Sequence, residues 1–488
     1  MNQNANRITL QQIARRAMIS RGFAPDFPTE LLEELKEINF PATYKSEEAK
    51  DLRSLRWCSV DNEDSLDIDQ LTYAEQLPGN KVRLLVAIAD VDALVTKQSN
   101  IDNYASQNTA TIYTVAQVFP MLPEKLSTDF TSMRMGADRC AVIVEMIVDD
   151  EGVVQQSDVY IATVCNHAKL QYENLGEWLE GNGPIPSEIL KVEGLAKNIQ
   201  LQDRIAQNMK ELRYEQGALE FKTIEARPVF DGDDLSEIKA ELKNRAKSLI
   251  EDFMIAANGA TARYLAEKSF PSIRRVVRTP RRWDRIVELA SERGFSLPEE
   301  ADSKSLSAFL KFIRQNDPQH FVDMSISVLK LLGPGEYVVE TPGSTPEGHF
   351  GLAVKDYTHS TAPNRRFPDL ITQRLLKSAM AGHSVPYSVE ELEEIARHCT
   401  LKEDDARKVE RKVEKSAMAM LMKSRIGEVF DAIVTGASSK GTWIRLYHPL
   451  VEGKLESGFR GLQVGNKLKA RLVQIDIEEG FIDFERVD

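Results

Sequence analysis

The feature that most constrains this chain is an acidic segment placed between two apolar ones. Residues 61–70 read Asp-Asn-Glu-Asp-Ser-Leu-Asp-Ile-Asp-Gln, with four aspartates and one glutamate. They follow residues 55–60 and precede the apolar run 84–89. Carboxylates this close repel one another and raise one another's pKa, so a folded protein keeps them together only with water or cations around them. Hard divalent cations such as Mg²⁺ bind carboxylate and substrate phosphate oxygens. The segment therefore favours phosphoryl chemistry.

Composition alone gives equal weight to a second interpretation of this segment, a solvated acidic loop without any ligand. A calcium-binding EF-hand loop fits this segment poorly. Such a loop needs glycine at its sixth position and glutamate at its twelfth. Counted from Asp61, these positions hold Leu66 and Thr72.

The overall composition predicts a water-soluble protein of several domains. The chain has 488 residues, which is more than a single hydrophobic core usually organises. It has no apolar run near the roughly 20 residues that span a bilayer, and no signal-peptide core, so we expect no membrane association. The four cysteines (Cys58, Cys140, Cys165 and Cys399) form no CxxC pair, which argues against a zinc site or a disulfide framework. A cytoplasmic location is expected.

The net charge of -13 argues against a nucleic-acid partner for the surface as a whole. An acidic exterior can nevertheless coexist with a local basic channel. One basic cluster surrounds Trp283 and consists of Arg274, Arg275, Arg278, Arg281, Arg282 and Arg285. Two interpretations remain open for this cluster: contact with RNA, or the exposed face of a helix with its preceding loop.

Hydrophobic periodicity divides the chain into three parts. Residues 1–50 form a short helical element, because apolar residues recur at helical spacing between positions 10 and 18. Residues 51–424 form the main domain, with strand-like runs up to about 165 and helices over 186–215, 240–268 and 388–424. Residues 425–488 contain five short strand candidates, which fit a small OB-type barrel. Trp443, Tyr447 and Phe459 of this barrel are candidates for stacking on bases, and the alternative for Trp443 is a core position.

A second dense motif follows His349. Residues 357–370 read Tyr-Thr-His-Ser-Thr-Ala-Pro-Asn-Arg-Arg-Phe-Pro-Asp-Leu. Pro363 suits a bend that presents Arg365 and Arg366, and Asp369 suits the first turn of an apolar helix. A guanidinium beside a carboxylate-bound metal is the arrangement that transfer of a phosphoryl group needs.

Together the two motifs resemble the catalytic domain of the ribonuclease II / ribonuclease R (RNB) family of exoribonucleases. The resemblance runs from about Leu55 to Ser424, includes family-like stretches at 86–90, 119–123, 254–258 and 349–352, and continues into a barrel similar to an S1 domain. It implies an α/β (α+β) catalytic domain with a mixed, mainly antiparallel sheet and flanking helices, followed by an OB-type S1 β-barrel. The chain looks like a short form without N-terminal cold-shock domains, since some fifty residues cannot hold two such barrels.

The resemblance also implies roles for individual residues. Asp61, Asp67 and Asp69 match aspartates that hold magnesium and the scissile phosphate, with Gln70 beside them as a further ligand, and Arg365 matches the arginine that braces that phosphate. The remaining matched or neighbouring positions are candidate RNA-binding residues: Tyr113 at the terminal nucleotide, Phe221 on the base stack, Tyr172 and Glu251 at the ribose, Glu410 near the 3′ end, Arg366, and Trp443 in the barrel. The alternatives are ordinary core positions for the aromatic residues and solvated helix faces for the glutamates.

Three departures from the family pattern stand out. Gln70 occupies the position of a fourth catalytic aspartate, which removes one negative charge from a site built for two cations. Ala362 and Asn364 replace Ser-like and Ile-like residues beside Arg365. A helical, weakly basic element stands where the cold-shock barrels are usual.

The resulting expectation is a monomeric enzyme that hydrolyses single-stranded RNA from its 3′ end and releases nucleoside 5′-monophosphates. Mg²⁺ is the expected cofactor, with Mn²⁺ as the alternative. The rival hypothesis is an RNA-binding protein of the same fold whose catalysis is weakened by Gln70. A nuclease of altered polarity, or one that cuts internally, is the third.

Overall fold

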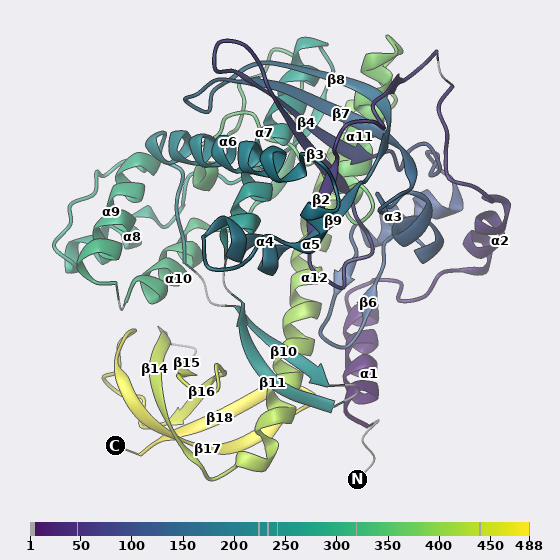
Figure 1. Ribbon diagram of the computed structural model, residues 1–488. Coiled ribbons are helices and arrows are strands. Elements are labelled where there is room, and N and C mark those ends of the chain that lie inside the picture. The colour runs from purple at the N-terminus through teal and green to yellow at the C-terminus, as the bar shows by residue number, and fades with distance from the viewer. Residues whose placement is uncertain are drawn as a thin grey trace.

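The computed structural model describes residues 5–45, 47–222, 225–231, 234–241, 243–318, 320–438 and 441–487. Figure 1 shows a large upper body built around one sheet, a barrel at the C-terminus, and the long helix α12 (Val389–Met422) running from one to the other. Among these residues no helix has the length and apolar character needed to cross a lipid bilayer. The four cysteines are free thiols.

The central sheet has seven strands in the order β1-β8-β7-β4-β3-β2-β9. The terminal pairs β1–β8 and β2–β9 are parallel and the other pairs are antiparallel, so the predicted mixed, mainly antiparallel sheet is confirmed. The strand bounds are β1 (Lys50–Asp51), β2 (Cys58–Asp61), β3 (Gln70–Gln76), β4 (Val82–Ala89), β7 (Asp138–Val148), β8 (Val154–Cys165) and β9 (Ala168–Gln171).

Both faces of this sheet are covered, which explains why its strands read as continuous apolar runs. In β4, Leu85 and Ala87 face one hydrophobic cluster, and Leu84 and Val86 face the other. The first cluster includes residues of α3 (Asn100–Asn108) and α11 (Phe367–Met380); the second includes residues of α6 (Leu195–Glu215) and α7 (Arg245–Glu267). Each fully buried leucine contributes roughly 1.5–3 kcal/mol.

Shorter elements complete the main body. Its other helices are α4 (Tyr172–Leu179), α5 (Ser187–Leu190), α8 (Trp283–Glu292), α9 (Ser303–Asn316), α10 (Phe321–Leu332), the π-helix η1 (Lys125–Phe130), and the 3₁₀ turns η2 (Phe350–Leu352) and η3 (Lys423–Arg425). Two-stranded sheets pair β5 (Ile112–Tyr113) with β6 (Val118–Phe119), β10 (Glu225–Asp231) with β11 (Asp234–Glu241), and β12 (Ser272–Val276) with β13 (Glu336–Glu340).

The N-terminal residues form α1 (Ala5–Ser20) and α2 (Thr29–Glu37). The apolar stripe of α1 packs in one cluster with residues of α12 and of the β5–β6 hairpin. Figure 1 shows α1 lying beside the lower half of α12. Arg16 on α1 pairs with Glu478 in the turn between the last two barrel strands, at 2.8 Å. The N-terminal helix therefore contacts both the main body and the barrel.

The predicted five-stranded barrel is confirmed. It closes in the order β14-β15-β16-β18-β17, with bounds β14 (Val429–Ser438), β15 (Gly441–Leu446), β16 (Glu452–Ser457), β17 (Lys467–Asp476) and β18 (Phe481–Arg486). The β17–β18 turn rests on α12. A Cβ on Gly480, whose φ is +67°, would lie 2.8 Å from Lys415 Cβ, so this approach requires glycine. On another side, Arg445 pairs with Asp323 of α10 at 2.7 Å.

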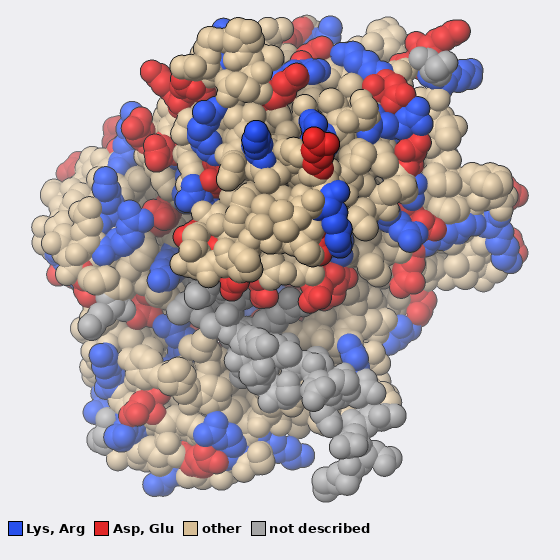
Figure 2. All heavy atoms as spheres, in the orientation of Figure 1, with Lys and Arg blue, Asp and Glu red and all other residues tan. Residues whose placement is uncertain are grey.

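The arginine cluster around Trp283 does not form one exposed patch. Arg274 and Arg275 lie in β12 with 1% and 6% exposure, and they pair with Glu340 and Glu403. Neither RNA contact nor an exposed helix face describes these two residues. Figure 2 shows cationic and anionic side chains interspersed over the visible upper body, without one dominant basic surface.

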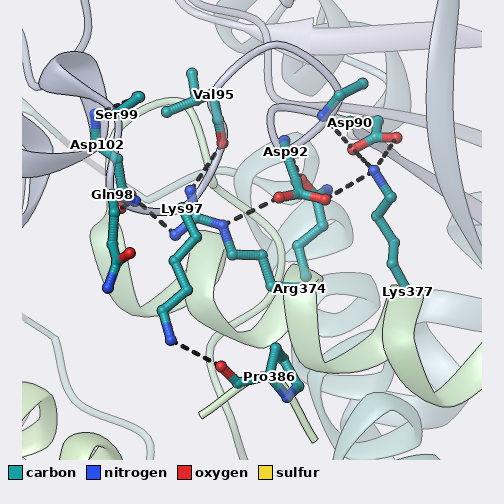
Figure 3. A network of polar contacts seen from close by, with 12 residues as sticks. Asp90, Asp92, Val95, Lys97, Gln98, Ser99, Asp102, Arg374, Lys377 and Pro386 are labelled. Atoms are coloured by element: carbon teal, nitrogen blue, oxygen red, sulfur yellow. Dashed lines mark hydrogen bonds and ion pairs between the residues drawn. The ribbon is translucent and has the colours of Figure 1, made fainter. Parts of the chain in front are cut away.

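A buried polar network fixes α11 to the loop that follows β4 (Figure 3). Arg374, with 4% of its side chain exposed, pairs with Asp92 at 3.0 Å and Asp102 at 2.8 Å and donates to the Val95 carbonyl oxygen. Lys377 pairs with Asp90 and Asp92 at 3.0 and 2.8 Å. Because buried charges are stable only when paired, the network holds the second half of α11 against the segment that follows β4.

Replacement of Arg374 by methionine tests this anchoring. The change leaves the buried Asp102 without its cation, so we expect the free energy of unfolding to fall by about 3–5 kcal/mol. Urea denaturation at neutral pH measures it. Arg285→Met, which breaks an exposed pair with Glu288, is the control and should change stability by less than about 0.5 kcal/mol. Equal effects of the two changes would contradict the assignment.

Candidate active site

The acidic segment forms the connection between β2 and β3. Strand β2 ends at Asp61 and β3 begins at Gln70, and the pairing of Cys58 with Thr72 brings these two ends together. Asp69 is fixed by its own backbone, because its carbonyl oxygen accepts from the Ala89 amide of β4 at 2.9 Å. We call residues 61–69 the aspartate loop. The charged residues at the two ends of this loop are therefore held close together, where the neighbouring strands β2 and β3 meet it.

A second loop, residues 361–366, meets the first from a distant part of the chain. We call it the arginine loop. The Asn364 amide donates to Asp69 Oδ1 and Arg365 Nε donates to Asp69 Oδ2, each at 3.0 Å. Asp69 and Arg365 are 296 positions apart in the sequence. The side chain of Asp69 is 2% exposed and that of Arg365 is 41% exposed, so part of the guanidinium stays accessible.

Tyr113 contacts the aspartate loop from the β5–β6 hairpin. Its hydroxyl donates to Asp67 Oδ2, and its backbone amide donates to Glu410 Oε1 at 3.1 Å. The β5–β6 hairpin and α12 position these two residues, because Tyr113 ends β5 and Glu410 lies in the middle of α12. The structure thus brings Tyr113, Glu410 and Asp67 together.

A cavity of about 350 Å³ opens between these elements. Seven of the predicted site residues line it: Asp61, Asp67, Asp69, Gln70, Tyr113, Tyr172 and Arg365. Five further lining residues were not predicted: Asn62, Ser65, Ile250, Met254 and Thr361. The spacing of Ile250 and Met254, four residues apart on α7 next to Glu251, was the available signal, since such residues share a helix face. The cavity is polar on its aspartate side and apolar on its α7 side.

Five predicted site residues lie outside this cavity lining, and one of them is Glu410, which contacts Tyr113 as described above. Glu251 pairs with Lys243, and Arg366 pairs with Asp369 at 2.7 Å in the first turn of α11. Phe221 packs against the hydrophobic cluster of α8, α9 and α10. Trp443 lies on β15 of the barrel, half-buried beside Gly436 and Gly441.

Burial in the cavity disfavours the ionised form of its aspartates. Burial, together with repulsion from Asp69, raises the pKa of Asp61 from 3.8 to about 7. Burial also raises the pKa of Asp69 to about 7, with the Asp67 charge adding to the rise and the Arg365 guanidinium opposing it. Near neutral pH the cavity therefore favours either bound protons or bound cations.

The residues present fit a hard divalent cation. Asp61 Oδ2 is buried and has no hydrogen-bond partner among the residues that the structure describes. Aspartate oxygens and the Gln70 amide oxygen are the ligand type that Mg²⁺ prefers. Within the same described ranges, no three acidic, histidine or cysteine side chains are already grouped closely enough to hold a metal ion. Tyr113 and Arg365 bind oxygens of Asp67 and Asp69, so a cation would compete with them for these atoms.

Comparison with known proteins identifies both parts of the chain. Residues 49–382 match the RNB domain, and residues 428–487 match the RNase II-type exonuclease C-terminal S1 domain. Ribonuclease R of Aquifex aeolicus is 28% identical over 494 residues, which cover 95% of this chain and 68% of that protein. Ribonuclease R of Escherichia coli is also 28% identical, over 483 residues that cover 90% of this chain and 58% of that protein.

Solved structures show the same fold. Mycoplasma genitalium RNase R in complex with ribose-methylated single-stranded RNA has a TM-score of 0.86 and 22% identity, covering 99% of this chain and 78% of that one. Yeast Ssd1, a pseudonuclease, has a TM-score of 0.72 and 15% identity, covering 95% and 58%. A shared fold at this level of identity therefore does not by itself decide whether a chain cleaves RNA.

The chain spans 58% and 68% of the lengths of the two curated relatives. The chain belongs to the RNB family and has the arrangement of an RNase II-type exonuclease, an RNB domain followed by an S1 barrel.

Proposed function

We propose that this protein is a 3′-to-5′ exoribonuclease that hydrolyses single-stranded RNA and releases nucleoside 5′-monophosphates. The observation that carries the proposal is the convergence of Asp61, Asp69 and Arg365 in one cavity from segments almost three hundred residues apart. The polarity and the product follow from the family resemblance, and the curated relatives are named Ribonuclease R. A monomer in the cytoplasm is part of the same proposal.

Asp61, Asp67 and Asp69 would hold the catalytic cation, for which Mg²⁺ is our assignment and Mn²⁺ the alternative. When bound, such a cation lowers the pKa of a coordinated water and neutralises charge on the phosphate. The accessible part of the Arg365 guanidinium would stabilise the charge that grows on the phosphoryl oxygens. Asp69 orients that guanidinium through the Nε contact, which leaves the outer edge of the group for the substrate.

The walls of the cavity suit a nucleotide. Tyr113 and Tyr172 place two aromatic side chains beside the aspartates. Stacking on aromatic rings is tolerant of base identity, at about 1–3 kcal/mol per base. Glu251 and Tyr172 are our candidates for contact with ribose, and Phe221, Glu410, Arg366 and Trp443 for contact with the strand farther from the cleavage point. Selectivity would then rest on the single-stranded state and the ribose, as RNA recognition commonly does.

Gln70 favours a second candidate, an RNA-binding protein that cleaves poorly. Its side chain lines the cavity with an amide where the family pattern has a carboxylate. Against this candidate, Asp61, Asp67, Asp69 and Arg365 are all retained and all line the same cavity. The nuclease is the better supported of the two.

Hydrolysis of a 3′-labelled oligoribonucleotide with Mg²⁺ or Mn²⁺ tests the proposal. Release of labelled mononucleotide supports the exonuclease, a retarded but uncut RNA supports the binding protein, and internal fragments support an endonuclease. We expect Asp69→Asn to reduce kcat by on the order of a hundredfold or more, because several kcal/mol of charge stabilisation is lost. Asp64→Asn, an exposed position of the same loop, is the control and should leave kcat unchanged. Equal turnover of wild type and Asp69→Asn would refute the assignment.

Gln70→Asp measures what the missing carboxylate does. A further carboxylate ligand should lower the Mg²⁺ concentration for half-maximal activity and for half-maximal thermal stabilisation by about tenfold. Gln76→Asp adds the same charge at the exposed far end of β3 and should leave both midpoints unchanged. An unchanged midpoint in Gln70→Asp would show that position 70 lies outside the cation's ligand set.

The raised pKa of Asp61 and Asp69 makes stability depend on pH. Between pH 3.8 and about 7 the folded protein retains protons that the unfolded chain has lost. The contribution of these groups to the free energy of unfolding therefore falls as pH rises through this interval in EDTA. Asp61→Asn should flatten this fall, and saturating Mg²⁺ should oppose it, since a cation binds the ionised form. Urea denaturation from pH 5 to 8 checks both; parallel curves for wild type and variant in EDTA would contradict the assignment.

A further inference from the structure

The aspartate loop and the arginine loop are also joined behind the cavity, through two successive residues. Thr131 and Ser132 directly follow the π-helix η1 and are buried, with 4% and 0% exposure. Neither residue lines the cavity. Each nevertheless contacts one of the two loops with its hydroxyl group.

Ser132 holds the aspartate loop. Its Oγ donates to the Leu66 carbonyl oxygen at 2.6 Å and accepts from the Ile68 amide at 3.1 Å. The next amide, of Met133, donates to the Ile68 carbonyl oxygen at 2.9 Å. These bonds fix the backbone on both sides of Asp67, the residue between Leu66 and Ile68. The Ser132 hydroxyl therefore holds in place the backbone that carries the Asp67 carboxylate.

Thr131 holds the arginine loop. Its Oγ1 is hydrogen-bonded to the side-chain amide of Asn364, and the Asn364 backbone amide donates to Asp69 Oδ1. Thr131 Oγ1 also lies 2.9 Å from the Leu126 carbonyl oxygen. One hydroxyl proton cannot serve both acceptors. A half-turn of the Asn364 amide lets its NH₂ group donate to Thr131 while the hydroxyl donates to Leu126, which satisfies both contacts.

This connection is made by a residue in which the chain departs from the family pattern. Asn364, fully buried, stands where an Ile-like residue is usual, and an isoleucine side chain cannot form a hydrogen bond to Thr131. A buried amide costs stability unless it is paired. The Thr131 contact pairs one of the two polar atoms of that amide and places Asn364, and with it Arg365, relative to the aspartate loop.

We propose that Thr131 and Ser132 are positioning residues that fix where the aspartate loop and the arginine loop lie relative to each other. The proposal rests on the nuclease function proposed above. Ser132 controls how the aspartates receive a cation, and Thr131 controls how Arg365 meets the phosphate. A misplacement of about 1 Å is enough to reduce the rate by about a hundredfold, so a small displacement of one loop relative to the other is measurable.

The chain provides a matched control for each variant. Thr128, three positions before Thr131, bonds within its own segment, where its hydroxyl donates to the Glu124 carbonyl oxygen at 2.8 Å. Ser127 is buried like Ser132, and its hydroxyl oxygen lies 3.2 Å from the Leu122 carbonyl oxygen and 3.4 Å from that of Pro123. The pairs Thr131→Val with Thr128→Val, and Ser132→Ala with Ser127→Ala, each remove one hydroxyl from the same short region.

We expect Thr131→Val to lower kcat about tenfold with little change in KM, and Thr131→Ser, which keeps the hydroxyl, to restore kcat. We expect Ser132→Ala to raise the Mg²⁺ concentration for half-maximal thermal stabilisation about tenfold. The two control variants should change neither quantity. Reduced melting temperatures with unchanged kcat and unchanged Mg²⁺ midpoints would overturn the proposal, since a purely structural role predicts that result.

Two features keep this test separate from the nuclease assignment. Thermal stabilisation by Mg²⁺ needs no RNA, so the Ser132 arm gives a result even for a protein that cleaves nothing. If wild-type protein takes up Mg²⁺ but releases no nucleotide, the nuclease proposal fails while the Ser132 arm still decides the positioning role. If Ser132→Ala does not fold, Thr131→Val and Thr131→Ser compare kcat without it.

Discussion

The contact between Asp69 and the arginine loop is the interaction on which the rest of the site depends. It joins the sheet to the segment that begins α11, and it places an anion and a cation together where burial would otherwise penalise each of them. A salt bridge of this kind is weak support for stability but strong support for a specific geometry, because its partners tolerate few alternative arrangements. The network of Arg374 and Lys377 holds the second half of the same helix. The start and the second half of α11 are therefore both fixed to neighbouring segments.

The surroundings of this contact show how the protein manages concentrated negative charge. Asp69 accepts hydrogen bonds from a backbone amide and from a guanidinium group. Asp67 accepts one from the Tyr113 hydroxyl. Asp61 has a buried oxygen with no hydrogen-bond partner among the described residues. The three aspartates are thus unequal. Asp61, whose buried oxygen has no hydrogen-bond partner among the described residues, gains most from a bound cation. Carboxylates with strongly perturbed environments of this kind are typical of functional sites.

Much of this architecture could be predicted from the sequence, and the limits are physical. The acidic segment, the strand runs and the five-stranded barrel carry local patterns, so they were predicted before any contact was known. The burial of Arg274 and Arg275 could not be, since it depends on Glu340 and Glu403, which lie 66 and 128 positions away. Thr361 and Ile250 enter the cavity lining only because distant elements meet there. The same holds for Thr131 and Ser132, whose hydroxyl groups have no sequence signature. Conversely, Arg366 sits beside Arg365 in the sequence but pairs with Asp369, because neighbouring side chains at the start of a helix point in different directions.

The ion pairs that hold the barrel against α1 and α12 have a further consequence. The turn between β17 and β18 is tied to α1 by Arg16 and Glu478 and to α12 by Lys412 and Glu479, and these acidic side chains are more than half exposed. Exposed ion pairs are screened as ionic strength rises, and attraction between a protein and RNA phosphates weakens in the same direction. Salt would therefore act on the proposed nuclease in two ways, by weakening its attraction to RNA and by weakening the ion pairs that hold the barrel against α1 and α12.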